Sequence, residues 1–318
     1  FLEAIFLSVL GKSFRSCDDD EMIKFGFNES LAKIDFQNRV AEHSVSFRLK
    51  RGKLRENVLN GQNVKKKAVV GLLNAVLFFP EDLWLIKGSP SIRRRFIDFE
   101  ISQTNPVYYQ ALLQYNRALY QRNQLLKQIN EGFSKRNLIA SWDDVLIELA
   151  EKLISFRILA TQQLSDIANK VHKKITNGAE DFSAHYFVFG RAQENEESYK
   201  KWYAESLKIS LDKDIRRGTT EFGPHRDDLI FLINSLEGKN FASQGQQRTA
   251  VLSLKLAEIE VMYQIMGEYP ILLLDDVMSE LDEKRRVMLI HEIKGKAQTF
   301  ITGTERMDEL KDLNPTYY

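Results

Sequence analysis

Two adjacent carboxylates, Asp275 and Asp276, follow directly on a run of large apolar residues from Ile271 to Leu274. Such a run predicts a strand that is buried on both faces, as the central strands of parallel sheets are. Ligand sites of α/β sheets lie at the carboxyl ends of these strands. A strand-end Asp can hold Mg²⁺ in phosphate-transferring enzymes, and a neighbouring acid can orient the attacking water. The same pattern also fits a buried strand that ends in a helix-capping acid.

A second candidate site is the segment Ser243-Gln244-Gly245-Gln246, which comes directly before an apolar run of helical period that extends to Met262. The start of a helix exposes unpaired backbone N–H groups and the positive end of the helix dipole, and both favour a phosphate. A simple N-cap by Ser243 explains the same residues. Taken alone, the segment leaves both interpretations open.

The order of the segments along the chain favours a phosphate-binding role for both candidate sites. The Ser243 turn precedes the strand that ends at Asp275, Ser279 and Asp282 follow that strand, and the strand-like Thr299–Thr302 comes last. This order resembles the heads of ABC-type ATPases, in which a signature motif, a Walker B strand, a D-loop and a final strand succeed one another. The resemblance implies that Asp275 positions Mg²⁺ and that Asp276 orients or activates water.

In ABC-type heads, ATP lies between two copies, one supplying the phosphate loop and Walker B acids and the other its signature helix. The resemblance therefore implies ATP and Mg²⁺ as cofactors and an ATP-dependent homodimer. The signature residues, Ser243, Gln244, Gly245 and Gln246, would bind ATP in trans. Ser243 and the amides of Gly245 and Gln246 would grip its γ-phosphate, and Ser279 and Asp282 would form the D-loop.

The pattern elsewhere predicts the elements that position these sites. The first ten residues have helical spacing, the alternating stretches between Met22 and Val64 predict antiparallel hairpins, and Ala75–Phe79 predicts a buried strand. Proline at the first helical position predicts helices from Pro90 and from Pro106 to about Asn130. Short strands are expected from Phe182, a helix around 197–207 and a strand over 229–233.

A third long helix is expected to begin at a capping box formed by Ser141 and Asp144, and to run to about Ile175. With the helix that starts at Pro106 it would form an antiparallel helical hairpin. We therefore expect an α/β fold in which an ATPase head, with a mixed sheet and an antiparallel β-lobe, carries an inserted helical arm. Residues 1–88 would form head lobe I, 89–180 the arm and 181–318 head lobe II.

Further motifs make the resemblance closer. They are Phe79-Pro80-Glu81-Asp82-Leu83, Gly88-Ser89-Pro90, Gly223-Pro224-His225-Arg226-Asp227-Asp228-Leu229 and Ser243-Gln244-Gly245-Gln246-Gln247-Arg248-Thr249. Together they resemble the RecF family of bacterial recombination and repair proteins, in the branch of ABC-type ATPases that contains structural-maintenance (SMC) and Rad50 heads. The resemblance spans essentially the whole chain.

The resemblance implies a DNA-binding protein of the cytoplasm that dimerises on ATP, hydrolyses it slowly and acts as a nucleotide-gated clamp. It would promote recombinase loading at gapped DNA, in recombinational repair, replication restart and the SOS response, with RecR and RecO as partners. The alternative is a structural SMC-like adaptor without nucleotide turnover.

One departure from the family favours that alternative. RecF-like chains carry G-x-x-x-x-G-K-[ST] before the segment that corresponds to Phe1, and this chain does not contain it. The Gly11-Lys12-Ser13 segment is not a substitute, because a phosphate loop would need glycine where Phe6 stands and a strand before it. We therefore expect the chain to lack its first strand and its phosphate loop. The final strand also ends in Thr302-Gly303-Thr304, without the switch histidine of transporters.

Charge and composition limit the other partners. Lys and Arg number 45 and Asp and Glu 44, so no global positive field attracts nucleic acid, and DNA must be bound by local patches. The candidates for phosphate contact without sequence readout are Arg93, Arg94 and Arg95, and Lys65 and Lys66. Four tyrosines of the predicted arm, Tyr108, Tyr109, Tyr115 and Tyr120, can either stack on bases or fill a core.

Two further observations restrict the class of protein. The single cysteine, Cys17, fits a reducing cytoplasm, and the chain has no apolar run of about 20 residues, so no membrane partner is expected. His225, Asp227 and Asp228 could suggest a metal nuclease. Adjacent residues on an extended segment point to opposite faces, so the two acids cannot easily share one ion, and a structural network is favoured.

Overall fold

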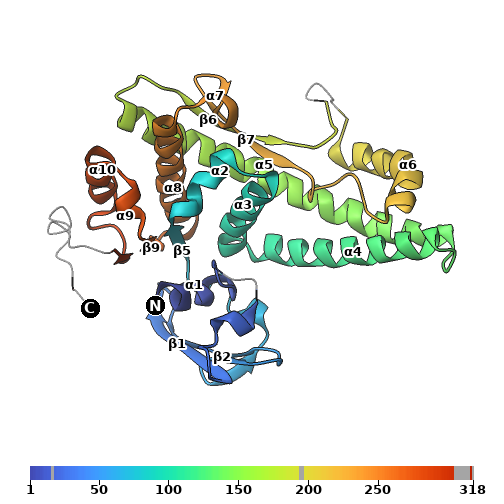
Figure 1. Ribbon diagram of the computed structural model, residues 1–318, viewed down its shortest axis with the longest axis horizontal. Helices are drawn as coiled ribbons and strands as arrows, with labels where there is room; N and C mark the ends of the chain where they lie inside the picture. Colours follow the sequence, from blue (N-terminus) through green and yellow to red (C-terminus); the bar gives the residue numbers. More distant parts are fainter. Residues whose placement is uncertain (16–17, 193–196, 304–315, 317–318) are drawn as a thin grey trace.

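A computed structural model describes residues 1–15, 18–192, 197–303 and 316 (Figure 1). Cys17 and Thr304 lie outside the described residues. The chain forms three sheets, with strand orders β1-β2-β3-β4, β10-β9-β5 and β6-β7-β8. None of the helices in the described part of the chain is long and apolar enough to cross a membrane.

The first part of the chain forms the helix and the antiparallel β-lobe that the sequence predicts. Its elements are α1 (Leu2–Leu10), η1 (Asp19–Met22), β1 (Glu29–Gln37), β2 (Glu42–Lys50), β3 (Glu56–Leu59), β4 (Gln62–Val64) and η2 (Lys66–Ala68). Asn60 and Gly61 both have positive φ, at 50° and 81°, as a tight hairpin turn requires. Strand β1 falls within the predicted hairpin region, but its bounds were not predicted, because its inward positions start with Ser30 and Ala32 and give only weak alternation.

The central sheet is parallel and contains the predicted Walker B strand. Strand β9 (Ile271–Asp275) lies between β5 (Ala75–Phe78) and β10 (Thr299–Thr302), and both pairings are parallel. One face of the sheet packs on α1. The other face packs on α8 (Gln244–Met266) and α10 (Glu283–Ile293). The prediction of a strand buried on both faces is therefore confirmed.

Two long helices, α4 (Pro106–Asn130) and α5 (Ile139–Thr176), form the helical hairpin that the sequence predicts for the arm. The other elements of this region are η3 (Pro80–Leu83), α2 (Trp84–Lys87), α3 (Pro90–Thr104) and η4 (Arg136–Leu138). Helices α4 and α5 pack along each other, and α6 (Tyr199–Arg217) packs on both (Figure 1). The predicted Ser141 capping box is wrong, because the turn of η4 leads straight into α5 and places Ser141 inside its first turn.

The remaining elements connect the arm to the head. They are β6 (Phe182–Phe187), β7 (Asp228–Ile233), β8 (Leu236–Glu237), α7 (Gly238–Phe241) and α9 (Val277–Glu280). The largest apolar core contains residues of α3, α4, α5, α6, β6, β7 and α8. The root of the arm and the helix that follows Ser243 thus share one core.

Candidate nucleotide and dimer site

The two predicted acids occupy the tip of β9, where hydrogen bonds fix the backbone. Asp275 has a side chain that is 13 % exposed; one oxygen accepts from the Thr302 hydroxyl at 2.9 Å and the other from the Arg15 guanidinium. Asp276 is exposed and has a φ of 53°. Its N–H donates to the Thr302 hydroxyl at 3.1 Å. Asp275 therefore faces a basic group, whereas the carboxylate of Asp276 is exposed and has no partner among the described residues.

The predicted signature segment forms a capping box at the start of α8. The Ser243 hydroxyl accepts from the Gln246 N–H at 3.2 Å, and the Gln246 side-chain oxygen accepts from the Ser243 N–H at 2.9 Å. This arrangement uses the Gln246 N–H within the helix cap. The N–H groups of Gln244 and Gly245 belong to the first helical turn, where no intrahelical acceptor exists. A phosphate at this helix start would meet Gln244 and Gly245 before Gln246.

Residues at the base of the arm form hydrogen bonds with this capping box. The Gln246 amide donates to Glu180 at 2.9 Å, and the second oxygen of Glu180 lies 3.1 Å from Nε2 of His172 on α5. Nδ1 of His172 lies 3.1 Å from the hydroxyl of Ser253 on α8. Burial lowers the pKa of His172. The signature turn is thus connected to the arm through a short polar chain.

A residue that the sequence analysis missed, Arg285 of α10, joins the signature turn to the D-loop. Its Nη2 donates to the Gly245 carbonyl at 2.9 Å and to the Thr249 hydroxyl at 2.8 Å. Its Nη1 donates to Asp282, which also caps α10 by accepting from the Arg285 N–H at 2.9 Å. The Asp-x-x-Arg spacing at a helix start was the available signal, since residues three apart share a helix face.

Ser279, the other predicted D-loop residue, contacts the Walker B tip. Its hydroxyl donates to the Asp276 carbonyl at 2.7 Å. The structure therefore brings the strand tip, the D-loop and the signature turn into neighbouring positions within one copy. It does not place Ser243 against Asp275 of the same copy through any contact among the described residues.

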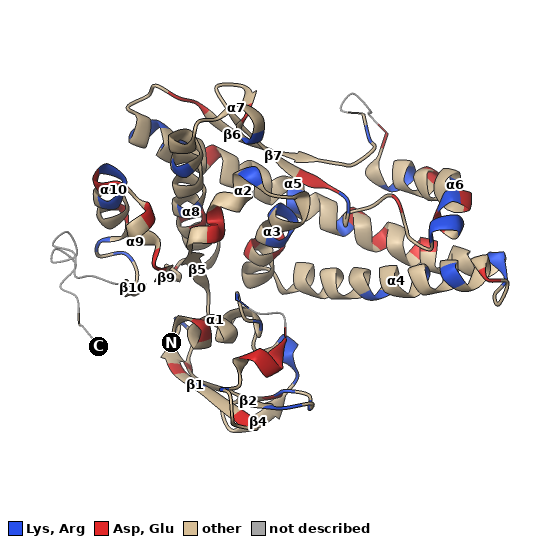
Figure 2. Cartoon of the chain, in the orientation of Figure 1, with Lys and Arg blue, Asp and Glu red and all other residues tan. Residues whose placement is uncertain are grey.

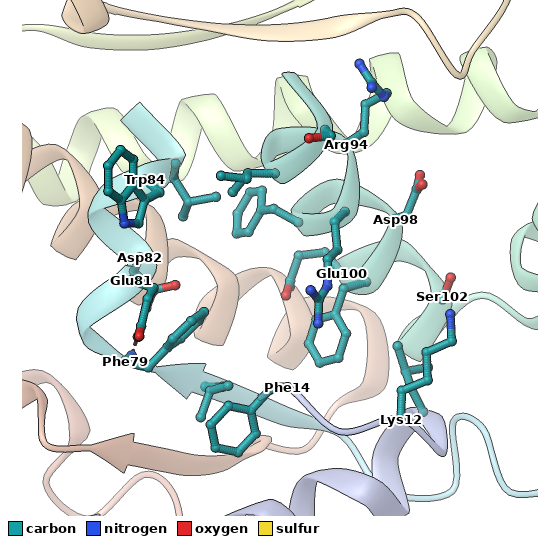
Figure 3. A pocket seen from close by; sticks show the side chains of 18 of the residues that line it. Lys12, Phe14, Phe79, Glu81, Asp82, Trp84, Arg94, Asp98, Glu100 and Ser102 are labelled. Atoms are coloured by element: carbon teal, nitrogen blue, oxygen red, sulfur yellow. Dashed lines mark hydrogen bonds between the residues drawn. The ribbon is translucent and has the colours of Figure 1, made fainter. Parts of the chain in front are cut away.

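A cavity of about 1030 Å³ opens beside the strand tip, between α1, η3 and α3 (Figure 3). Asp275 and Asp276 lie on its wall. Lys12 and Arg15, which follow α1 in the chain, also line it and bring positive charge to the cavity. Aromatic rings, Phe14 and Phe79 among them, supply the apolar wall. The Gly11-Lys12-Ser13 segment follows the end of α1 at a left-handed Gly11 (φ 59°), so a helix precedes it, and not the strand that a phosphate loop needs.

Buried charges form the back of this cavity. Lys255 of α8 donates to Glu258 at 2.8 Å. Asp82 and Glu100 also lie near Lys255, and against the effect of burial the three carboxylates together raise its pKa. Burial raises the pKa of Asp82 to about 7 and that of Glu100 to about 6. The pKa of Glu258 is also raised by burial and by Glu100. One ammonium group cannot neutralise three carboxylates, so the cluster retains protons near neutral pH.

Because of this cluster, we expect the stability of the fold to depend on pH. The isosteric substitution Asp82→Asn should remove the part of this dependence that comes from Asp82. The folded pKa of Asp82, about 7, lies above its ordinary value of 3.8, so the native state binds the extra proton and stability falls as pH rises between these values. We expect the free energy of unfolding of the unmodified protein to fall, relative to Asp82→Asn, by about 2 kcal/mol between roughly pH 5 and pH 7.5.

Urea denaturation at several pH values measures this difference. Glu81→Gln is the matched control, since Glu81 is exposed and adjacent. Curves of stability against pH that run parallel for the unmodified protein and Asp82→Asn would contradict the assignment.

The structure corrects part of the predicted DNA patch. Arg93 is buried and forms a two-pronged ion pair with Asp228, at 2.7 and 2.8 Å, so it is not available to a phosphate. Arg94 is half-buried and donates to the Asp227 carbonyl at 2.6 Å. Arg95 is exposed. Only Arg95 of the three retains the geometry of a phosphate contact.

The two predicted lysines also differ. Lys65 is exposed, whereas Lys66 is half-buried and its aliphatic chain lies against Gly11. Burial, together with repulsion from Lys12 and Arg55, lowers the pKa of Lys66 to about 7. Lys66 therefore carries only part of a positive charge at neutral pH, which weakens it as a phosphate ligand.

The metal-nuclease alternative is wrong for the geometry that the structure shows. His225 contacts the Tyr115 hydroxyl at 2.8 Å, Asp227 accepts from Tyr186 at 2.7 Å, and Asp228 holds Arg93. Burial lowers the pKa of His225 to about 4. No group of three metal-ligating side chains is found among the described residues. These residues form the structural network that the sequence favours.

Comparison with known proteins identifies the family. No protein-family model matches the chain. The protein RecF of Alkaliphilus oremlandii is 44 % identical over 317 residues, which cover 99 % of this chain and 86 % of the relative. DNA replication and repair protein RecF of Bacillus subtilis is 40 % identical over 309 residues, covering 95 % and 83 %.

Solved structures agree. The recombination mediator protein RecF with ATP, of the RecFOR pathway, superposes with a TM-score of 0.89 at 35 % identity and covers 96 % of this chain and 83 % of that one. An Smc head domain of Pyrococcus yayanosii, with a coiled coil and joint, has a TM-score of 0.50 at 14 % identity over 95 % of this chain and 84 % of that one, and is similar in fold alone. The expected ABC-type head with an inserted arm is therefore confirmed, and the chain belongs to the RecF family of DNA replication and repair proteins.

Proposed function

We propose that this protein is an ATP-dependent DNA-binding repair protein in which two copies close around nucleotide and clamp DNA. The observation that carries the proposal is that three predicted parts of the nucleotide site lie next to one another on one surface. They are the tip of β9, the D-loop and the turn at the start of α8. Ser279 connects the D-loop to Asp276, and Arg285 connects the D-loop to Gly245. A partner copy that presses on this surface would meet all three elements together. A RecF structure with ATP, 35 % identical, supports nucleotide as the ligand.

The side chains at the tip of β9 fit Mg²⁺ bound to a nucleotide. Mg²⁺ takes oxygen ligands, and it is usually held by one or two carboxylates together with substrate phosphates. Asp275 and the Thr302 hydroxyl supply such oxygens 2.9 Å apart. Arg15, now paired with Asp275, would be released toward phosphate oxygens.

The roles of the individual residues follow from this placement. Asp275 would hold Mg²⁺, which polarises the transferred phosphate when it is bound. Asp276, exposed and one residue later, would orient the attacking water. Across the dimer, Ser243 and the helix-start amides of Gln244 and Gly245 would bind the γ-phosphate of the partner's nucleotide, while the Gln246 N–H stays in the helix cap. Slow hydrolysis would then separate the copies and release DNA.

The biological role follows from the family. We propose that the clamp acts at gapped DNA, where it promotes recombinase loading in recombinational repair and replication restart with RecR and RecO. Arg95 and Lys65, both exposed, remain candidates for phosphate contacts on the head. These contacts would carry no sequence readout. A location in the cytoplasm stays a prediction.

Asp275→Asn in the full-length protein tests the proposal. The amide keeps the hydrogen bond from Thr302 but loses the charge that Mg²⁺ requires, so nucleotide-dependent dimerisation should disappear and ATP hydrolysis should fall roughly 100-fold or more. Light scattering and phosphate release measure the two effects. Unchanged dimerisation and hydrolysis would overturn the proposed function.

A further inference from the structure

Helix α4 carries no carboxylate along its 25 residues. Asp and Glu make up 44 of the 318 residues, about one in seven, and the neighbouring α5 carries five. Figure 2 shows α4 along one edge of the arm, with α5 and α6 packed on one side of it only. The outward side of α4 is thus a long surface without negative side chains.

The cations of α4 divide into a structural one and two exposed ones. Arg122 is fully buried and pairs with Asp143 at 2.6 Å and Asp214 at 2.8 Å. Arg117 and Lys127 are exposed and form no ion pair with any described residue. They lie about 15 Å apart along the helix, which is the length of roughly four phosphates on one strand of DNA.

Most of the exposed positions between and around these cations carry amides. Gln114, Asn116, Gln121 and Gln128 are exposed, and Gln110 and Gln124 are half-buried. With 100° per residue, these positions and the two cations fall on one half of the helix surface. Amide side chains donate hydrogen bonds to phosphate oxygens without adding a negative charge. The composition of this face therefore complements a polyanion and offers nothing that would repel it.

The positive surface continues past the end of α4. The side chain of Lys127 packs beside Gly218, which places Arg216 and Arg217 at the end of α6 next to it. Both arginines are exposed and form no ion pair within the described ranges. Glu131, which follows α4, is the nearest acid along the chain. Two helices thus contribute to one cationic end of the arm.

Exposed aromatic rings lie on this surface and in the turn that follows it. Of the four arm tyrosines, Tyr108, Tyr109 and Tyr115 are buried, as the core interpretation predicts, but Tyr120 is 60 % exposed. Phe133, in the turn after α4, is 80 % exposed. Aromatic rings that alternate with unpaired cations are typical of surfaces that bind single-stranded nucleic acid, where bases stack on the rings.

Resting on the proposed DNA-binding function, we propose that the outward face of α4 is a DNA-binding surface of the arm. Arg117 and Lys127 contact phosphates about four apart on one strand, and Tyr120 stacks on an unpaired base. Arg95, near the start of α3 on the wall of the cavity beside Asp275, is a separate candidate contact on the head. The arm therefore binds the single-stranded part of a gapped substrate by charge and stacking, with no sequence preference.

Fluorescence anisotropy of the full-length protein with ATP and Mg²⁺ tests this surface, with labelled oligothymidine of ~30 nucleotides and a duplex of equal length as probes. The double variant Arg117→Gln, Lys127→Gln should weaken binding of both roughly tenfold. The slope of log affinity against log salt should become shallower by about 1.4 for the single strand and about 1.8 for the duplex. Tyr120→Ala should weaken binding of the single strand roughly tenfold and that of the duplex much less.

Lys200→Gln is the matched control, because Lys200 is a partly exposed cation that is already paired with Glu148 of α5. It should leave both affinities unchanged, and every variant should still dimerise with nucleotide. If the unmodified protein binds neither probe, the proposed function itself fails. If it binds DNA but the double variant keeps both its affinity and its salt slope, the α4 surface alone is overturned.

Discussion

Asp276→Asn should reduce ATP hydrolysis by the full-length protein roughly 100-fold or more, while nucleotide-dependent dimerisation persists. The φ of 53° at this position lies in the left-handed region, which Asn adopts as readily as Asp, so the substitution keeps the backbone at the strand tip. The N–H that donates to Thr302 is also retained. The variant removes only the exposed carboxylate that would orient water.

Steady-state phosphate release gives the turnover, and light scattering gives the dimer. The comparison with Asp275→Asn is decisive, because that variant should lose both nucleotide-dependent dimerisation and ATP hydrolysis. Glu283→Gln is the control for a nearby exposed acid. If Asp276→Asn hydrolyses ATP at the rate of the unmodified protein, Asp276 has no catalytic role.

Lys255→Met should destabilise the fold by about 3–5 kcal/mol near neutral pH, because it leaves buried carboxylates without their cation. The Lys255 side chain is 5 % exposed, donates to Glu258 at 2.8 Å, and lies over the rings of Phe78 and Phe96. Methionine preserves most of the volume, so the loss reports on charge. The effect should be smaller at about pH 5.5, where Glu100 and Asp82 bind protons.

Urea denaturation measures this stability, with Lys201→Met as the control on a side chain that is 78 % exposed. That control should change stability by no more than about 1 kcal/mol. Adding Glu258→Gln to Lys255→Met should recover part of the loss, since it removes one of the unpaired charges. An equal loss for Lys255→Met at both pH values would show that packing, and not charge, is responsible.

The elements around the site are predictable from local signals. Pro90 and Pro106 mark the starts of α3 and α4, since a proline at the first helical position needs no N–H partner. The unbroken apolar run identifies β9 as a doubly buried strand. Ser243 and Gln246 form the capping box expected of a helix start. Each of these signals involves residues within one turn or one strand.

The contacts that decide function are not local, and sequence reasoning missed them for that reason. Arg93, Arg94 and Arg95 look alike in sequence, but they point in different directions around α3, and Asp228, 135 residues away, determines that Arg93 is buried. The pairing of Arg15 with Asp275 joins residues 260 apart. Neither pairing leaves a pattern that spacing along the chain can reveal.

The mass of the full-length protein in solution, with and without ATP and Mg²⁺, tests the central claim most directly. If the strand tip of one copy and the α8 helix start of another together hold a nucleotide, light scattering should give the mass of one chain without nucleotide and twice that mass with it. A single mass under both conditions, whether of one copy or of two, would contradict a site that nucleotide completes between copies.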